Sequence, residues 1–421
     1  MFKFLKISIN SEAPSELIEL KYLLVSLIPC YINSKGQRYF DPLWYKDLLQ
    51  HLEYIKYFTL ASPCLNQEPP SGFVAIASHA QLEKISFIDL PAPKSFFDAL
   101  RLLPVTIIQL WHAISKAEIV HTGIAGWPIP PGWLVTPIVK FQKKIYLIIV
   151  ESAFWRLSPV VTKTFKGRIR AALSECINRW CINNTDLAIF TQDQYRKSLM
   201  TRHPERGHVI HASWISEENI LTEQSAASIW LKKIALPVEE MRVLFAGRLT
   251  ADKGLSVLLK AMQLLGQEKV AIKLDILGRG DLENECHTNS RRLQFPAEIC
   301  ILGTVSYGTE FFKLISNYHL VVVPSISDEQ PRIVYDAYSQ AVPVLASDTA
   351  GLRDCVFNGD TGLLVAPNQV QALAELLKWS TNHREELERM GMSALRVAQK
   401  MTHREMHRQR WQLLVEMITR I

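Results

Sequence analysis

The sequence lacks several features that would place the protein across a membrane or in an oxidising compartment. It has no run of about 18 uncharged apolar residues, because Lys140, Lys143 and Lys144 interrupt its most apolar window, 133–150. We therefore expect no transmembrane helix. The first 16 residues do not contain the apolar core of a secretory signal peptide. The seven cysteines form no Cys-x-x-Cys pair, which favours a reducing, cytoplasmic location.

Metal-binding and nucleic-acid-binding motifs are also missing. No Asp-x-Asp pair occurs, no His/Cys group has metal-site spacing, and there is no P-loop or Ser-His-Asp elbow. The excess of positive charge is confined to residues 1–215, which hold 24 Lys and Arg against 16 Asp and Glu. Anionic lipid, a polyanionic acceptor or an ordinary solvated surface would all fit this charge. Without a recognition helix or an aromatic-rich sheet motif, we expect no nucleic acid partner.

The chain of 421 residues is long enough for two domains, and apolar runs alternate with helical patterns along it. Strands are predicted at 22–28, 55–60, 85–88, 118–121, 145–150, 187–190 and 208–210, with a loop at 29–41. A polar stretch, 212–240, is predicted to connect this series to a second one, with strands at 242–246, 271–277, 298–302, 320–324, 342–346 and 362–365. The alternation predicts two doubly wound parallel sheets, followed by a helical tail over 368–421.

Two acidic residues mark the end of the second series. The stretch 321–365 has the pattern strand, polar loop, helix, strand, which is a parallel βαβ unit. Asp328 lies at the carboxyl end of the first strand and Asp336 about one turn into the helix. Because ligands of open parallel sheets bind outside the carboxyl ends of the strands, both carboxylates are candidates for the same site.

Two cations follow the first strand of the second series. The segment LFAGRLTADKG, 244–254, ends a strand and opens a helix, and a turn of this kind points backbone N–H groups at anions. Arg248 adds a forked donor and Lys253 a compact charge. The pair is suited to a diphosphate and to the charge that develops on it as a leaving group.

Together these segments resemble the retaining GT-B glycosyltransferases of family 4. SDEQPRIVYDAYSQAVPVLAS is similar to the acidic donor segment of that family, with Asp328 and Asp336 in place of two glutamates and Ala341 where glycine is usual. The Gly-Arg-Leu…Lys-Gly pattern of 247–254 is the second shared motif. The resemblance covers 240–370. It implies a Rossmann-like acceptor domain over 1–215, a Rossmann-like donor domain over 216–400, and a last helix, 401–421, that packs back on the first domain.

The resemblance also implies a role for each matching residue. Arg248 and Lys253 would bind the donor diphosphate, and Val305 would line the nucleobase pocket. Residues that would contact the donor sugar or the ribose are Asp328, Glu329, Arg332, Ile333 and Asp336. In the first domain, His121 at the end of strand 118–121 is the candidate catalytic residue beside Asp328, and Glu151 ends the next strand.

The activity implied by the resemblance is hexosyl transfer from a nucleoside-diphosphate sugar to a hydroxyl of a glycan, polysaccharide or lipid-linked sugar, with retention and without cofactor or metal. Two alternatives stay open. The paired Glu-to-Asp change is compatible with an idle GT-B scaffold that binds a nucleotide or a partner, and sugar-nucleotide 2-epimerases share the fold. The lysines and arginines between 140 and 170 predict contact with the anionic inner face of a membrane.

Overall fold

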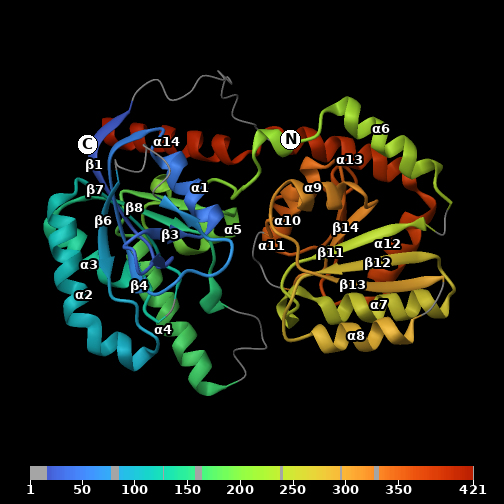
Figure 1. The fold of residues 1–421 in the computed structure, drawn as a ribbon, viewed down its shortest axis with the longest axis horizontal. Helices are drawn as coiled ribbons and strands as arrows, with labels where there is room; N and C mark the ends of the chain where they lie inside the picture. The colour runs from blue at the N-terminus through green and yellow to red at the C-terminus, as the bar shows by residue number, and fades with distance from the viewer. Residues whose placement is uncertain are drawn as a thin grey trace.

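The computed structural model describes residues 17–76, 85–126, 128–156, 164–237, 240–293, 296–326 and 331–420. They form two α/β halves that lie side by side (Figure 1). One half is built on a ten-stranded sheet and the other on a six-stranded sheet. The predicted fold class, two parallel-sheet domains with C-terminal helices, is confirmed.

The first sheet has the order β10-β9-β8-β7-β1-β4-β2-β3-β5, with β6 beside β4. Its parallel strands are β1 (Ile18–Val25), β4 (Ile55–Asn66), β6 (Ile85–Leu90), β7 (Ile119–Gly123), β8 (Ile145–Val150), β9 (Leu187–Phe190) and β10 (Gly207–Val209). Its helices are α1 (Pro42–His51), α2 (Phe96–Lys116), α3 (Pro131–Gln142), α4 (Phe165–Ile182) and α5 (Asp193–Leu199). Strand β8 (IYLIIV) is almost wholly buried, as continuous apolar runs in parallel sheets are.

One edge of the first sheet departs from the prediction of a loop over 29–41. That segment contains β2 (Cys30–Ile32) and β3 (Arg38–Phe40), and β3 pairs antiparallel with both β2 and β5 (Val74–Ala75). The two strands are only three residues long, so their alternation is too short to stand out from a loop in the sequence. The first domain therefore has a small antiparallel extension at one end of its parallel sheet.

The second sheet is entirely parallel, in the order β13-β12-β11-β14-β15-β16. Its strands are β11 (Arg242–Ala246), β12 (Ile272–Leu277), β13 (Ala297–Gly303), β14 (Leu320–Val323), β15 (Val344–Ser347) and β16 (Gly362–Val365). Its helices are α7 (Leu255–Gln267), α8 (Glu283–Arg292), α9 (Thr309–Ser316), α10 (Ile333–Ser339), α11 (Ala350–Arg353), α12 (Val370–Asn382) and α13 (Arg384–Ala398). In parallel sheets the carboxyl ends of the strands share one edge, which here positions the loops of the candidate site.

The segment predicted to be a polar connection, 212–240, contains a helix instead, α6 (Glu223–Ala235). Ala226 and Trp230 of this helix are buried in the core of the second domain, and the Trp230 indole donates to the Ala341 carbonyl at 2.8 Å. Lys233 is also buried, with Nζ 2.6 Å from the Tyr318 carbonyl oxygen. The inward positions thus follow helical spacing, but a lysine occupies one of them and hides the apolar pattern.

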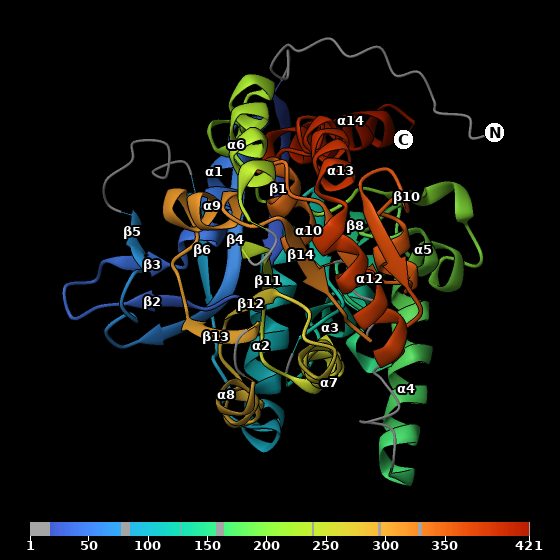
Figure 2. The same cartoon turned by 90° about the vertical axis from the view of Figure 1, so that its right-hand side faces the viewer.

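The last helix, α14 (His403–Thr419), lies over the first half although the segments before it belong to the second (Figures 1 and 2). Met406, Leu414 and Met417 are buried in the apolar core that also contains Tyr22 and Phe58. The chain thus crosses between the two halves twice. The domain limits expected at 215 and 400 remain predictions, because the two cores do not define where each domain ends.

No helix in the described ranges is long and apolar enough to cross a membrane. All seven cysteines lie in these ranges and are free thiols.

Candidate functional site

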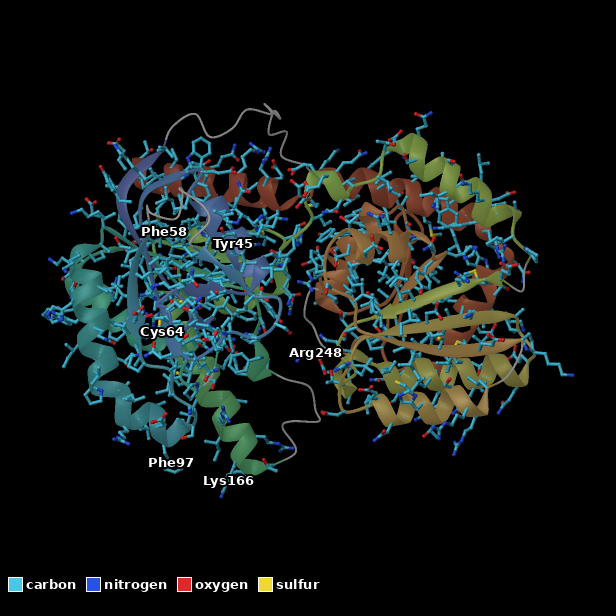
Figure 3. The ribbon with its side chains drawn as sticks, in the orientation of Figure 1. Tyr45, Phe58, Cys64, Phe97, Lys166 and Arg248 are labelled. Carbon is cyan, nitrogen blue, oxygen red and sulfur yellow. The ribbon has the colours of Figure 1, made fainter. Side chains whose placement is uncertain are left out.

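A pocket of ≈ 490 Å³ opens at the carboxyl edge of the second sheet. Its volume lies in the range of small-ligand sites. Arg248, at its rim, is on the side of the second domain that faces the first (Figure 3). The predicted residues that line this donor pocket are Arg248, Lys253, Val305, Arg332, Ile333 and Asp336. The structure brings these side chains together, and the roles assigned to them stay predictions.

The two predicted diphosphate ligands are held by one carboxylate. Lys253 Nζ lies 3.5 Å and Arg248 Nη2 3.9 Å from the same oxygen of Asp252. Burial by itself raises the pKa of Asp252, but the hydroxyl of Thr250 and the two cations lower it overall. The ionised carboxylate therefore orients both cations before any ligand arrives. The Arg248 side chain remains 70% exposed, which leaves its guanidinium accessible from the pocket.

The turn that presents these cations depends on Gly254. This residue has φ of +69° and is the N-cap of α7, directly after the 3₁₀ turn Ala251–Lys253. A Cβ at this position would lie 1.8 Å from the carbonyl oxygen of Pro324, at the end of β14. Glycine is thus required both by the left-handed backbone and by the close approach of the neighbouring loop.

Asp336 is buried at the base of the pocket and has two polar neighbours. The Tyr307 hydroxyl donates to Asp336 Oδ1 at 2.8 Å, and Arg332 Nε lies 3.8 Å from Oδ2. The Arg332 guanidinium stacks over the Tyr307 ring, 4.7 Å from its centre. Tyr307 was not among the predicted residues, since an aromatic residue before a helix gives no local signal of a site.

The protonation of Asp336 is set by its burial. Removal from water raises the pKa of Asp336 to about 7, although the charge of Arg332 and the hydrogen bond from Tyr307 act to lower it. The charge of Lys46, from α1 of the first domain, also lowers it. The carboxyl group is therefore poised to change its charge near neutral pH.

The remaining predicted residues of the second domain divide into two groups. Val305 follows β13 and is 38% exposed, and Ile333 begins α10. Both contribute apolar surface to the walls of the donor pocket. Asp328 and Glu329, by contrast, lie outside the described residues. Of the two predicted carboxylates, Asp328 and Asp336, only Asp336 therefore belongs to the described site.

The connection between the domains supplies a wall that the sequence did not predict. Trp214 lines the donor pocket, and its carbonyl accepts from Lys46 Nζ at 2.8 Å. Lys46 also donates to the hydroxyl of Ser216 at 2.5 Å. A lysine of α1 thus fixes the connection beside the pocket. The contact joins positions 168 residues apart, so no local pattern could reveal it.

The predicted first-domain residues lie in a second pocket. His121 and Glu151 line this acceptor-side pocket of ≈ 400 Å³, together with Asp47 and Arg410. His121 Nδ1 is 2.8 Å from the Tyr22 hydroxyl, and burial holds the pKa of His121 well below its usual value. The ring is therefore neutral at physiological pH. None of the residues that line the donor pocket contributes to this one.

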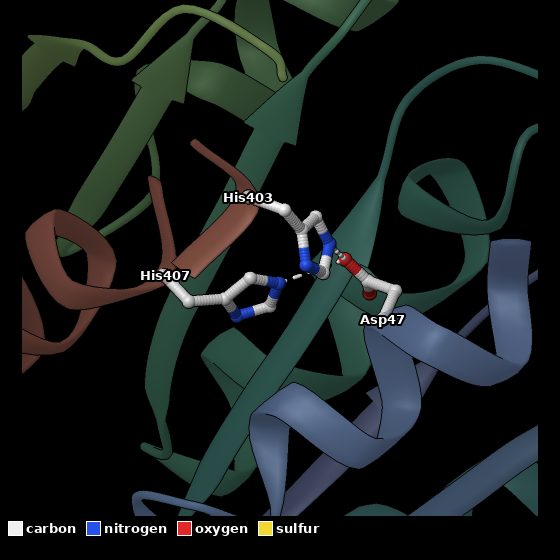
Figure 4. Close-up of side chains that lie close together, drawn as sticks. All are labelled: Asp47, His403 and His407. Carbon is white, nitrogen blue, oxygen red and sulfur yellow. Dashed lines mark hydrogen bonds and ion pairs between the residues drawn. The ribbon is translucent and has the colours of Figure 1, made fainter. Parts of the chain in front are cut away.

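A cluster of ionisable residues adjoins the acceptor-side pocket and joins α1 to α14 (Figure 4). His407 Nε2 lies 2.9 Å and His403 Nε2 3.3 Å from the same oxygen of Asp47. The other nitrogen of His407 is 3.0 Å from the Tyr54 hydroxyl. The side chains of Asp47, His403 and His407 are close enough to share a metal ion. Both ring nitrogens of His407 nevertheless already have a hydrogen-bond partner, Asp47 for Nε2 and Tyr54 for Nδ1.

Comparison with known structures identifies the class of the fold. The structure is similar to that of HepE from Anabaena in complex with UDP, with a TM-score of 0.65 and 14% identity over 96% of this chain and 100% of that one. It is also similar to sucrose-phosphate synthase from Thermosynechococcus elongatus, with a TM-score of 0.69 and 15% identity over 95% of this chain and 100% of that one. The fold is therefore that of the GT-B glycosyltransferases.

The sequence comparisons point to glycosyltransferases for the second half of the chain. Residues 227–396 match the model of Glycosyl transferases group 1. It is 34% identical over 126 residues to a D-inositol 3-phosphate glycosyltransferase of Pseudarthrobacter chlorophenolicus, which is 29% of this chain and 30% of that protein. It is 29% identical over 143 residues to an uncharacterized glycosyltransferase of Methanocaldococcus jannaschii, 34% of this chain and 36% of that protein. These matches span only about a third of the relatives' length.

Proposed function

We propose that this protein transfers a hexosyl group from a UDP-sugar to a hydroxyl of a glycan or a lipid-linked acceptor. The observation that carries the proposal is the convergence of Arg248, Lys253 and Asp336 in one pocket of small-ligand size. Two cations and a carboxylate at the carboxyl edge of a parallel sheet suit a nucleoside diphosphate. The donor would bind to residues 216–400, and the acceptor would bind to residues 1–215.

Each side chain has a chemical task in this proposal. Arg248 and Lys253 neutralise the diphosphate and stabilise it as it leaves, so the reaction needs no metal ion. Asp336, when ionised, accepts two hydrogen bonds from the ribose hydroxyls. By the resemblance to family 4, Arg332, Ile333, Asp328 and Glu329 would contact the sugar and the ribose, and Val305 would contact the base.

The choice of UDP rests on relatives. HepE has been solved with UDP and with UDP-glucose, at a sequence identity that by itself supports only the fold. The resemblance to family 4 implies retention of the anomeric configuration. Among the curated relatives is a capsular polysaccharide biosynthesis glycosyltransferase of Staphylococcus aureus, which supports a glycan acceptor.

We place the acceptor in the pocket of His121 and Glu151, with His121 as the catalytic residue of the first domain. A neutral imidazole can accept or donate a hydrogen bond to a sugar hydroxyl. The reaction would take place at the cytoplasmic face of a membrane, where the cations of the first domain meet anionic lipid.

The test is thermal unfolding with UDP, GDP, ADP or dTDP, followed by a transfer assay with the donors of the nucleotide that binds. A ligand at a hundredfold excess over its Kd stabilises the fold by about 2.7 kcal/mol, so a true site gives a clear shift. We expect UDP to shift the transition most and UDP-sugars to be turned over. Binding without turnover would favour the idle scaffold, and release of an epimerised donor would identify a 2-epimerase. No shift with any nucleotide would refute the proposal.

A further inference from the structure

The outer surface of the first domain carries an apolar band that the two pockets do not use. Helices α2, α3 and α4 lie side by side against the first sheet, with α3 in contact with both of the others. Phe97, near the start of α2, and Lys166, near the start of α4, project from the same end of the domain (Figure 3). The first turns of the two helices thus face solvent together.

Helix α2 is apolar on both of its faces. Its inner face buries Ala99, Leu110, Ala113 and Ile114. Its outer face exposes Phe97, Leu100, Val105, Ile108 and Trp111, and Phe97 is 82% exposed. A helix that is apolar all round is normally buried, so the outer face of α2 lacks the surface that would cover it.

Helix α4 exposes a second apolar stripe. Its members recur at helical spacing, and all are exposed: Phe165, Ile169, Leu173 and Trp180. Phe141, at the end of α3, is 74% exposed and packs against Trp111 with ring centres 5.3 Å apart. Three neighbouring helices therefore present aromatic and aliphatic side chains to solvent, which is unusual for the surface of a monomer.

The same helices are strongly basic. The segments 94–116, 140–144 and 164–180 contain ten lysines and arginines but only two acidic residues, Asp98 and Glu175. Glu175 is already engaged by Arg156 and Arg179. The basic residues are Lys94, Arg101, Lys116, Lys140, Lys143, Lys144, Lys166, Arg168, Arg170 and Arg179.

We propose that this α2–α4 surface docks on an anionic lipid bilayer. Exposed aromatic side chains insert at the lipid interface, and lysines and arginines around them attract anionic headgroups. A second copy of the chain fits less well, because it would bring two basic surfaces together. This docking specifies the membrane contact of the proposed function and rests on that function. Contact would be made by a defined apolar surface, and not only by the attraction of basic residues to anionic lipid.

A small apolar pocket of ≈ 60 Å³ supports this orientation. Leu102, Leu103, Thr106 and Leu110 of α2 form one wall of it. It shares Val25, Ser26, Leu27 and Pro131 with the pocket of His121 and Glu151. An amphiphilic acceptor could therefore keep apolar carbons beside α2 while its polar head lies in the acceptor-side pocket.

The test is flotation of the full-length protein with vesicles of phosphatidylcholine alone or with about 30 mol % phosphatidylglycerol. We expect binding to the anionic vesicles only, and a decrease as salt is added. Replacing two apolar residues, Phe97→Ser with Ile108→Ser, should weaken binding at least about tenfold. Reversing two charges, Lys140→Glu with Lys166→Glu, should do the same.

Matched controls change exposed residues of the second domain. Leu231→Ser replaces an apolar side chain that is 68% exposed, and Lys260→Glu with Arg292→Glu reverses two exposed charges. Both controls should float like the unchanged protein. If a control lost as much flotation with anionic vesicles as its matched variant, the proposal would be refuted. Failure of the unchanged protein to float with these vesicles would also refute it. A dimer that Phe97→Ser with Ile108→Ser dissociates, without flotation, would assign the surface to self-association instead.

The UDP-induced thermal shift is measured on the same samples. Flotation without a UDP shift would refute the proposed function but support the lipid surface. A UDP shift without flotation would support the proposed function but refute the lipid surface. A UDP shift retained by both surface variants shows that their loss of flotation does not come from unfolding.

Discussion

Asp47 and His407 are 360 positions apart, yet their side chains meet at 2.9 Å and join α1 to the last helix of the chain. Burial lowers the pKa of His407 well below its usual value, and it also lowers the pKa values of His51 and His403. These rings are therefore neutral in the folded protein. In the unfolded chain they would take up protons near pH 6.5.

The stability of the protein should therefore fall in weak acid. A group whose folded pKa is depressed stabilises the fold above its unfolded pKa, and this contribution is lost as the pH falls below about 6.5. Each histidine that stays neutral costs about 1.4 kcal/mol per pH unit below that point. Urea denaturation at pH 7.5, 6.5 and 5.5 measures the slope, and His407→Gln should make it shallower. A slope that does not change in His407→Gln would mean that this ring titrates in the folded state.

Lys253→Ala should weaken UDP binding at least about tenfold, because a charge-assisted contact to the diphosphate is lost. Uridine, which carries no phosphate, should bind the variant and the unchanged protein equally. Titration calorimetry with both ligands separates the two effects. Lys260→Ala, an exposed lysine of α7, is the control. If uridine and UDP lost affinity alike, Lys253 would be holding the turn rather than the phosphates.

Asp336→Asn should have opposite effects on stability and on nucleotide binding. Since the folded pKa is raised to about 7, an ionised Asp336 costs stability as the pH rises from about 4 to 7. The neutral amide can still accept from Tyr307, and should stabilise the free protein at pH 8 by on the order of 2 kcal/mol. Binding of uridine, which has the ribose hydroxyls but no phosphate that titrates in this range, should strengthen with pH through about 7 in the unchanged protein and be independent of pH in the variant. A pH-independent affinity in the unchanged protein would exclude Asp336 as the ribose ligand.

Gly254→Ala should destabilise the second domain by roughly 3 kcal/mol or more, because the new Cβ would collide with the Pro324 carbonyl oxygen. Gly36→Ala is the matched control. Gly36 also has a positive φ, +77°, but nothing lies within 4 Å of its Cβ position. The control should therefore lose only the cost of the left-handed backbone, about 1 kcal/mol. Equal losses in the two variants, measured by urea denaturation, would show that the collision is relieved by a small shift.

The sequence was most informative where each element carries its own pattern. The strands 145–150, 187–190 and 362–365 have the predicted bounds, because continuous apolar runs identify buried parallel strands. Ala341, at the position where the resemblance to family 4 leads us to expect glycine, has φ of 54°, so this departure from the motif coincides with a left-handed backbone. Local spacing likewise brought Arg248 and Lys253 to one turn.

Features made by distant segments could not be predicted in this way. Lys46 of α1 meets Trp214 of the connection beside the donor pocket across 168 positions, and Tyr307 reaches Asp336 from another loop. The exposed stripe of α4 has the same helical spacing as a buried one, so only the packed structure distinguishes them. Local patterns define elements, whereas a binding site is defined by the packing of those elements.

The double crossing of the chain between its halves should restrict how the donor pocket and the acceptor-side pocket move relative to each other. The two crossings lie together: the His403 amide donates to the Ile215 carbonyl at 2.8 Å, and the rings of Trp214 and His403 stack with centres 5.3 Å apart. We expect these two adjacent backbone segments to act as a hinge that limits sliding or twisting of one half past the other. Opening and closing would then be a rotation about one axis, and ligands in the two pockets would meet in a single relative orientation.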